Sequence, residues 1–131
     1  KQLHLEENIT FLGWLDNTSA LFEQTDIFCL PSLHEPFGIV LLEALVQSKA
    51  VITTDTEGPR EIVTHEKHAL IVPKNNPQAM ADAIIRLNED KELQQTLGTN
   101  GYELVQSHYD ITIVSKLIDN ALNKVVEAYG Q

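Results

Sequence analysis

The chain has 131 residues, 43% of them hydrophobic and 21% charged, which suits one globular domain with a buried core. Its formal net charge of −10 argues against a nucleic-acid-binding protein, because a basic surface is needed to neutralise phosphates. The single cysteine, Cys29, excludes a disulfide framework within the chain and fits a cytoplasmic protein. No apolar run approaches the roughly 18–20 residues of a membrane span. Because the chain begins with Lys1 and not with Met, we expect it to be a piece of a longer polypeptide.

Short apolar segments alternate with helical patterns along the first two thirds of the chain. Four apolar segments that end at Gly, Pro or a polar residue are expected to be strands: residues 9–13, 26–30, 50–54 and 69–72. Helices are expected between them: residues 20–24, 39–46 and 58–63. Strands that are apolar on both faces and alternate with helices are typical of a parallel sheet. The pattern therefore predicts an α/β fold, a Rossmann-like parallel sheet with flanking helices.

The last third of the chain has helical patterns only. One helix is expected to follow Asn76, a second to follow Asp90 and a third to follow Asp110. Gly98 and Gly101 are expected to interrupt the second of these helices. We find no internal repeat and no linker, so the whole chain is expected to be one domain that ends in a C-terminal helical layer.

Glu35 and Glu43 are two carboxylates separated by seven residues, and a helix is expected to begin between them, just after a strand. Ligands of open parallel sheets bind outside the carboxyl ends of the strands, and a helix N-terminus there favours an anion such as phosphate. The first-turn N–H groups, expected from Phe37 to Val40, lack intrahelical partners, and Gly38 leaves room for an anion. Glu43 lies among apolar residues and needs a hydrogen-bond donor. That donor is a ligand hydroxyl, such as those of ribose, or else a backbone N–H or a lysine of the fold.

The segment Glu35-Pro-Phe-Gly-Ile-Val-Leu-Leu-Glu43 resembles the two-glutamate signature of retaining GT-B glycosyltransferases, and most of all that of glycosyltransferase family 4 (group 1). Further blocks of that family are matched in order and at its spacing: residues 9–13, 26–32, 43–45, 50–55, 58–63 and 70–73. The resemblance covers about residues 8–109. It implies that the chain is most of a donor-binding domain, the incomplete C-terminal half of a GT-B fold.

The resemblance implies a hexosyltransferase that moves a hexose from a nucleotide sugar to an acceptor with retention of anomeric configuration. Glu35 would be the catalytic residue and would hydrogen-bond the transferred sugar, while Glu43 would bind the ribose. The donor-binding residues that the resemblance implies are Glu35, Pro36, Phe37, Gly38, Ile39, Val40, Glu43, Thr54 and Gly58. The nucleotide sugar is a substrate, and the family implies no metal and no further cofactor. The acceptor stays open between lipopolysaccharide, another glycolipid and a small molecule such as sucrose.

The resemblance also implies parts that this sequence does not contain. The family's donor domain begins with two further strands, which supply an Arg and a Lys to the diphosphate, and a separate N-terminal domain binds the acceptor. We therefore expect this fragment alone to be inactive, and the full protein to associate peripherally with the membrane. In the family's strand order the two strands would lie between residues 9–13 and 26–30. We expect a gap there, a rearranged N-terminus, or self-association of two copies through exposed sheet edges.

Two alternatives stay open. One is a sugar-nucleotide epimerase of the same overall fold, and the other is a non-catalytic interaction module that has kept the fold. The five histidines show no spacing typical of metal ligands. Ser48, Glu66 and His68 depart from glycines that are frequent in the family, and since all three fall in expected turns they affect loop shape more than chemistry.

Overall fold

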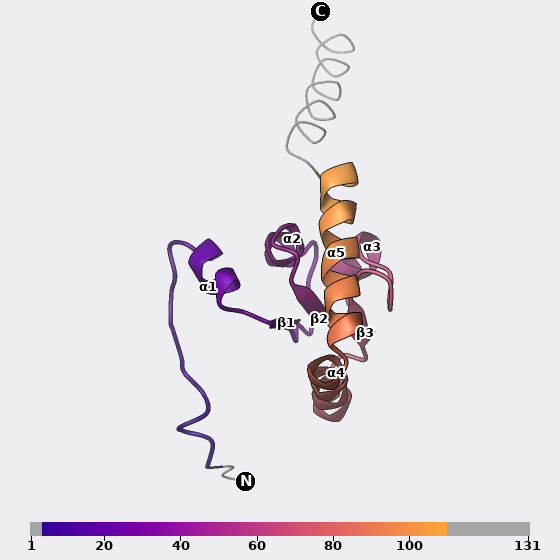
Figure 1. Ribbon diagram of the computed structural model, residues 1–131. Helices are drawn as coiled ribbons and strands as arrows, with labels where there is room; N and C mark the ends of the chain where they lie inside the picture. The colour runs from indigo at the N-terminus through magenta and orange to yellow at the C-terminus, as the bar shows by residue number, and fades with distance from the viewer. Residues whose placement is uncertain (1–3, 110–131) are drawn as a thin grey trace, which may run out of the picture.

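The computed structural model describes residues 4–109 and consists of alternating helices and strands followed by two longer helices (Figure 1). In chain order the elements are α1 (Ser19–Glu23), β1 (Ile27–Leu30), α2 (Ile39–Val46), β2 (Ala50–Thr54), α3 (Glu57–Ile62), β3 (Leu70–Val72), α4 (Pro77–Glu89) and α5 (Lys91–His108). This order confirms the α/β fold that the sequence predicts. Among the described residues, no helix has the length and apolar character needed to cross a bilayer.

The three strands form one parallel sheet in the order β1-β2-β3, so that β2 is the central strand. Phe28 of β1 lies opposite Val51, and Ile52 of β2 lies opposite Leu70 of β3. All residues of β2 are buried, as expected of a central strand that is apolar on both faces. Because parallel strands point the same way, the segments that follow β1, β2 and β3 meet at one edge of the sheet. We call this edge the carboxyl edge.

Helices cover both faces of the sheet, and the core is therefore divided into two clusters. Neighbouring residues of β2 point to opposite faces, so Val51 belongs to one cluster and Ile52 to the other. The first cluster forms under α2, and the second forms under α4. The long helix α5 contacts α2, α4 and β2 and contributes to both clusters, through Val105 to the first and Leu97 to the second. It therefore ties the two layers together (Figure 1).

The predicted interruption of α5 is wrong, because the helix continues through Gly98 and Gly101. Both glycines are buried. A Cβ at Gly98 would collide with the carbonyl oxygen of Ser48, and one at Gly101 would lie 2.5 Å from Cδ2 of Leu45. Glycine is a poor helix former, but here close packing of α5 on the turn between α2 and β2 offsets its low propensity.

Two turns carry non-glycine residues in a conformation that favours glycine. Ser48 has a φ of +56° and Glu66 a φ of +61°, both in the left-handed region. These are two of the positions at which the resemblance implies a frequent glycine. Ser48 and Glu66 thus keep the left-handed turn conformation that glycine adopts more easily. The cost is the strain of a side chain in that conformation.

Residues 9–13, predicted to be the first strand, form no strand in the described part of the chain, so this prediction is wrong. They belong to an irregular segment that leads into α1 and runs clear of the sheet in Figure 1. Phe11 and Trp14 are 94% and 90% exposed. A strand obtains its hydrogen bonds from a neighbouring strand, and the described chain offers none beside this segment. Association of two copies through exposed sheet edges stays a prediction. The helix predicted after Asp110 lies outside the described residues.

Candidate functional site

The segment between β1 and α2, residues 31–38, crosses the carboxyl edge of the sheet; we call it the β1–α2 loop. It ends at Gly38, which caps α2 with φ +94° and ψ +53°. The carbonyl oxygen of Gly38 accepts hydrogen bonds from Leu41 N–H at 3.0 Å and Leu42 N–H at 3.3 Å. The helix therefore begins at Ile39, and Phe37, predicted to lie in its first turn, belongs to the loop. Gly38 is needed for its left-handed backbone as well as for the space that it leaves.

Two residues at the carboxyl end of β2 and the start of α3 hold the β1–α2 loop. The Thr54 hydroxyl donates a hydrogen bond to the carbonyl oxygen of Ser32 at 2.6 Å. The Gly58 N–H donates to the carbonyl oxygen of Glu35 at 2.8 Å. A Cβ at Gly58 would lie 2.5 Å from the carbonyl oxygen of Phe37, so only glycine allows this approach. Thr54 and Gly58 were predicted as ligand-binding residues, and in this structure their donor groups position the loop.

Glu35 is held next to the N-terminus of α2. Its side chain is half-buried, and its Cγ would lie 3.6 Å from a Cβ placed on Gly38. The first-turn amides of a helix carry a partial positive charge, which favours a carboxylate or another anion at this position. The two-glutamate segment thus places one carboxylate at the edge where ligands of parallel sheets bind.

Glu43 lies on α2, four residues after Ile39 and therefore about 6 Å further along the helix axis. Its side chain is half-buried, and its Oε2 accepts a hydrogen bond from the Thr18 hydroxyl at 3.1 Å. The need for a donor is confirmed, but the donor is neither of the protein partners that the sequence suggested, a backbone N–H or a lysine. The donor, Thr18, lies 25 residues away in the sequence, and no local pattern points to it. The apolar neighbours of Glu43 were a signal that a partner exists, but they did not say which.

Apolar side chains remain exposed around the β1–α2 loop. Leu33, Phe37 and Ile39 are 57%, 50% and 67% exposed. Two hydroxyls, Oγ1 of Thr53 near the end of β2 and Oγ1 of Thr56 just before α3, are buried without a hydrogen-bond partner among residues 4–109. The carboxyl edge of the sheet therefore combines helix amides, a carboxylate and exposed apolar surface, which is the composition of a binding site.

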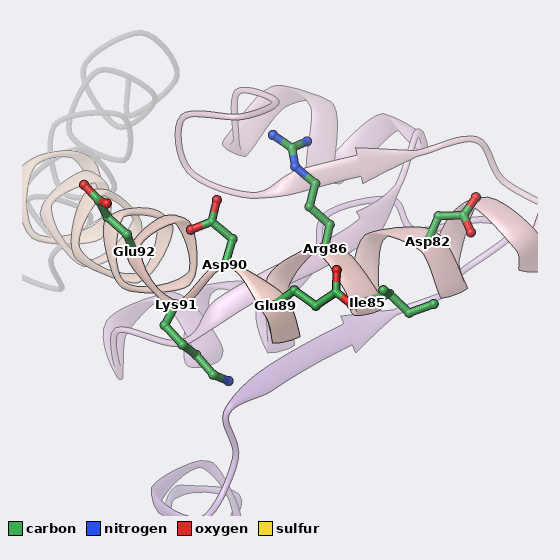
Figure 2. A pocket seen from close by; sticks show the side chains of 7 residues that line it. All are labelled: Asp82, Ile85, Arg86, Glu89, Asp90, Lys91 and Glu92. Carbon is green, nitrogen blue, oxygen red and sulfur yellow. The ribbon is translucent and has the colours of Figure 1, made fainter.

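Another hollow lies away from this edge, between α4 and α5, and has a volume of about 820 Å³. Figure 2 shows that its side chains spread outward along α4 and the start of α5 and do not converge on one point. Its lining residues are Asp82, Ile85, Arg86, Glu89, Asp90, Lys91 and Glu92. None of them is a predicted site residue. A smaller hollow of about 370 Å³ lies at the carboxyl edge and is lined by Thr54 together with Pro31 and Leu33 of the β1–α2 loop.

Groups that could hold a metal are absent from residues 4–109, where no cluster of three or more His, Cys, Asp or Glu side chains has suitable geometry. His65 and His68 use their Nδ1 atoms to accept backbone hydrogen bonds, from Ile71 N–H at 2.9 Å and Thr64 N–H at 3.1 Å. These two histidines therefore have a structural role in the turn before β3.

Parallel strands, flanking helices and a helix N-terminus at the carboxyl edge define an α/β unit of the Rossmann-like class. The family follows from comparison with known proteins. Residues 1–104 match the family described as glycosyl transferases group 1, so the chain belongs to the group 1 glycosyltransferases.

Individual relatives agree with this family. The chain is 33% identical over 108 residues to the lipopolysaccharide core biosynthesis glycosyltransferase LpsD of Rhizobium meliloti, a match that covers 82% of this chain and 32% of that protein. It is 33% identical over 109 residues to the N-acetyl-alpha-D-glucosaminyl L-malate synthase of Bacillus anthracis, covering 83% of this chain and 29% of that protein. The chain thus spans about a third of the length of these relatives.

Solved structures share the fold. Sucrose-phosphate synthase from Thermosynechococcus elongatus superposes with a TM-score of 0.90 at 29% identity, covering 95% of this chain and 32% of that one. Anabaena HepE in complex with UDP-glucose superposes with a TM-score of 0.89 at 26% identity, covering 92% and 33%. The C-terminal domain of the group 1 protein LpcC from Francisella tularensis gives 0.74 at 30% identity, covering 82% and 56%.

Proposed function

We propose that this chain is the donor-binding part of a retaining glycosyltransferase, which transfers a hexose from a nucleoside-diphosphate sugar to a glycan, lipid or small-molecule acceptor. The observation that carries the proposal is the β1–α2 loop, held by Thr54 and Gly58 so that Glu35 stands at the N-terminus of α2. The structural likeness to HepE, which was solved with UDP-glucose, supports the same ligand class.

The diphosphate of the donor is placed at the first turn of α2. The amides of Ile39 and Val40 are there, and Gly38 presents no side chain to a phosphate oxygen. Hydrogen-bond donors fixed before the reaction stabilise the charge that develops on a leaving diphosphate. The chain's net charge of −10 fits a donor site whose remaining positive charge comes from other parts of the protein. We propose neither a metal nor a cofactor for the reaction.

The two glutamates have different tasks in this proposal. Glu35 lies in the loop, where it accepts hydrogen bonds from hydroxyls of the transferred sugar and acts as the catalytic residue. Glu43 lies further along α2 and accepts hydrogen bonds from the ribose. Pro36 and Phe37 follow Glu35 in the same loop and are the further residues of the loop that bind the donor in this proposal. The whole protein works in the cytoplasm and, with a lipid acceptor, at the membrane surface; the relatives named for lipopolysaccharide core biosynthesis and as phosphatidyl-myo-inositol mannosyltransferase suggest such acceptors.

Calorimetric titration of the whole protein with UDP-glucose, GDP-mannose, UDP and GDP tests the proposal. Glu35→Gln is expected to weaken the nucleotide sugar by about tenfold while it leaves the free nucleotide nearly unchanged, because only the sugar contacts this carboxylate. Glu43→Gln is expected to weaken both by a similar factor. Glu103→Gln, on the exposed part of α5, is the matched control. Absence of binding by all four ligands would contradict the proposal.

The stereochemical outcome is tested separately. Proton NMR of the first product formed by the whole protein is expected to show the anomeric configuration of the donor. An inverted product would overturn the retaining mechanism and would leave donor binding untouched.

A further inference from the structure

Thr18 stands at the start of α1 but does not cap it. A threonine at this position usually accepts a hydrogen bond from a first-turn N–H of its own helix. Here the described structure gives Thr18 no such side-chain bond, and its hydroxyl donates instead to Oε2 of Glu43 at 3.1 Å. Asn17 takes over part of the capping, because its Oδ1 accepts the N–H of Ser19 at 2.9 Å. A hydroxyl that leaves its local role for a contact 25 residues away is typical of a functional position.

The partner of this hydroxyl is one of the two carboxylates of the candidate site. Glu43 is half-buried, and a hydrogen bond to an ionised carboxylate is stronger than one between neutral groups. The bond uses one acceptor position on Oε2. Oε1 and the second lone pair of Oε2 are the acceptor positions that a ligand hydroxyl would use.

The contact is supported on both sides by packing. On α1, Phe22 is buried in the cluster under α2, and its ring meets that of Phe28 edge-on at 5.4 Å. On α2, Leu41, Ala44 and Leu45 are fully buried around the turn that carries Glu43. Because both helices are anchored, the hydroxyl can hold the carboxylate in one orientation.

We propose that Thr18 is a positioning residue that orients Glu43 toward the ribose of the donor, and that it thereby sets the preference of the site for ribonucleotides over deoxyribonucleotides. This inference rests on the proposed donor binding. Thr18 acts through Glu43 and does not itself touch the reacting atoms. In the whole enzyme its loss raises KM for the donor and leaves kcat nearly unchanged, since the ribose contact is the same before and during transfer.

The test uses calorimetry on the whole protein to compare the binding of UDP with that of 2′-deoxy-UDP and 3′-deoxy-UDP. If GDP binds more tightly than UDP, the corresponding GDP series is used. The wild-type protein is expected to prefer the ribonucleotide over at least one deoxy form by about tenfold. Thr18→Val keeps the shape and removes the hydroxyl, and it is expected to reduce this ratio to about twofold. Thr18→Ser is expected to restore the ratio, and Ser19→Ala, which removes a neighbouring hydroxyl, is expected to leave it unchanged.

The outcomes separate the inference from the proposal beneath it. An equal loss of affinity for ribo and deoxy forms in Thr18→Val would mean a merely structural role and would overturn the inference. An unchanged ratio would overturn it as well. If the wild-type protein binds UDP and both deoxy forms equally well, Glu43 does not contact the ribose. That result would overturn this inference but would leave donor binding standing. No nucleotide binding in the wild-type protein would overturn both.

Discussion

Residues 9–13 and residues 26–30 have nearly the same local pattern, a short β-rich run that ends at Gly or Pro, yet only the second forms a strand. The difference lies in the neighbours. Ile27–Leu30 pairs with β2 in parallel register, whereas residues 9–13 have no strand beside them in the described chain and expose Phe11 to solvent. A pattern thus reports that a segment can be a strand, but a partner decides whether it becomes one.

The largest difference between the two regions is expected in stability. Leu45 is fully buried between α2 and α5, so Leu45→Ala is expected to reduce the free energy of unfolding by about 2–5 kcal/mol. Phe11→Ala removes a larger side chain, but one that is 94% exposed, and is expected to change the free energy by less than about 0.5 kcal/mol. Urea denaturation followed by circular dichroism measures both. A loss above 1 kcal/mol for Phe11→Ala would mean that the N-terminal segment is packed in solution.

A smaller effect is expected where the packed region supports the site. Gly58→Ala places a Cβ 2.5 Å from the carbonyl oxygen of Phe37 and weakens the bond from Gly58 N–H to Glu35. We expect a loss of about 1–3 kcal/mol in the free energy of unfolding, together with weaker binding of the nucleotide sugar. Gly13→Ala is the control from the N-terminal segment, because a Cβ there meets nothing within 4 Å. Its φ of +67° lies in the left-handed region, so Gly13→Ala is expected to cost about 1 kcal/mol.

Stability is also expected to depend on pH through the packed region. Burial, with the nearby charges of Lys67 and His108, lowers the pKa of His68, whose Nδ1 accepts the Thr64 N–H. The folded protein therefore binds this proton less readily than the unfolded chain does. The contribution of His68 is fully present above the unfolded pKa of about 6.5 and is lost as pH falls through and below it.

Thermal unfolding between pH 7.5 and pH 5 checks this direction. His68→Gln is expected to flatten the decline in Tm toward acid. His4→Gln, in the exposed N-terminal segment, serves as the control and should keep the wild-type slope. A decline that is the same in all three proteins would assign the acid sensitivity to other groups.

The smallest signal is expected from the N-terminal segment itself. Trp14 is the only tryptophan of the chain and is 90% exposed, with its Nε1–H donating to Asp16 at 3.1 Å. Its fluorescence maximum is therefore expected near that of free tryptophan, with little change on unfolding. A blue shift that grows with protein concentration would support association of two copies through this segment. A blue-shifted maximum at every concentration would contradict its exposure within one chain.

Much of the packed region could be predicted from the sequence. The bounds of α2 and β2 agree with the sequence because both elements are almost continuously apolar and end at polar residues. The position of Glu35 at a helix N-terminus could be predicted for the same reason. The sequence could not show that α5 continues through Gly98 and Gly101, because their close packing against Ser48 and Leu45 depends on tertiary structure.

The remaining features of the site depend on contacts between distant residues. The Thr18–Glu43 bond joins residues 25 positions apart, and no local period encodes it. The family resemblance placed Thr54, the last residue of β2, and Gly58, in α3, near the site. Their function as supports of the β1–α2 loop needed the hydrogen bonds to Ser32 and Glu35.

Both of these supports end on main-chain carbonyl oxygens, those of Ser32 and Glu35, and so they do not depend on the side chains of the loop. Leu33 and His34, between the two anchors, are exposed and free to change without loosening the backbone. Mutation at these two positions can therefore vary the surface offered to a ligand at little cost in stability. A library at Leu33 and His34 is the natural starting point for redirecting the specificity of this scaffold.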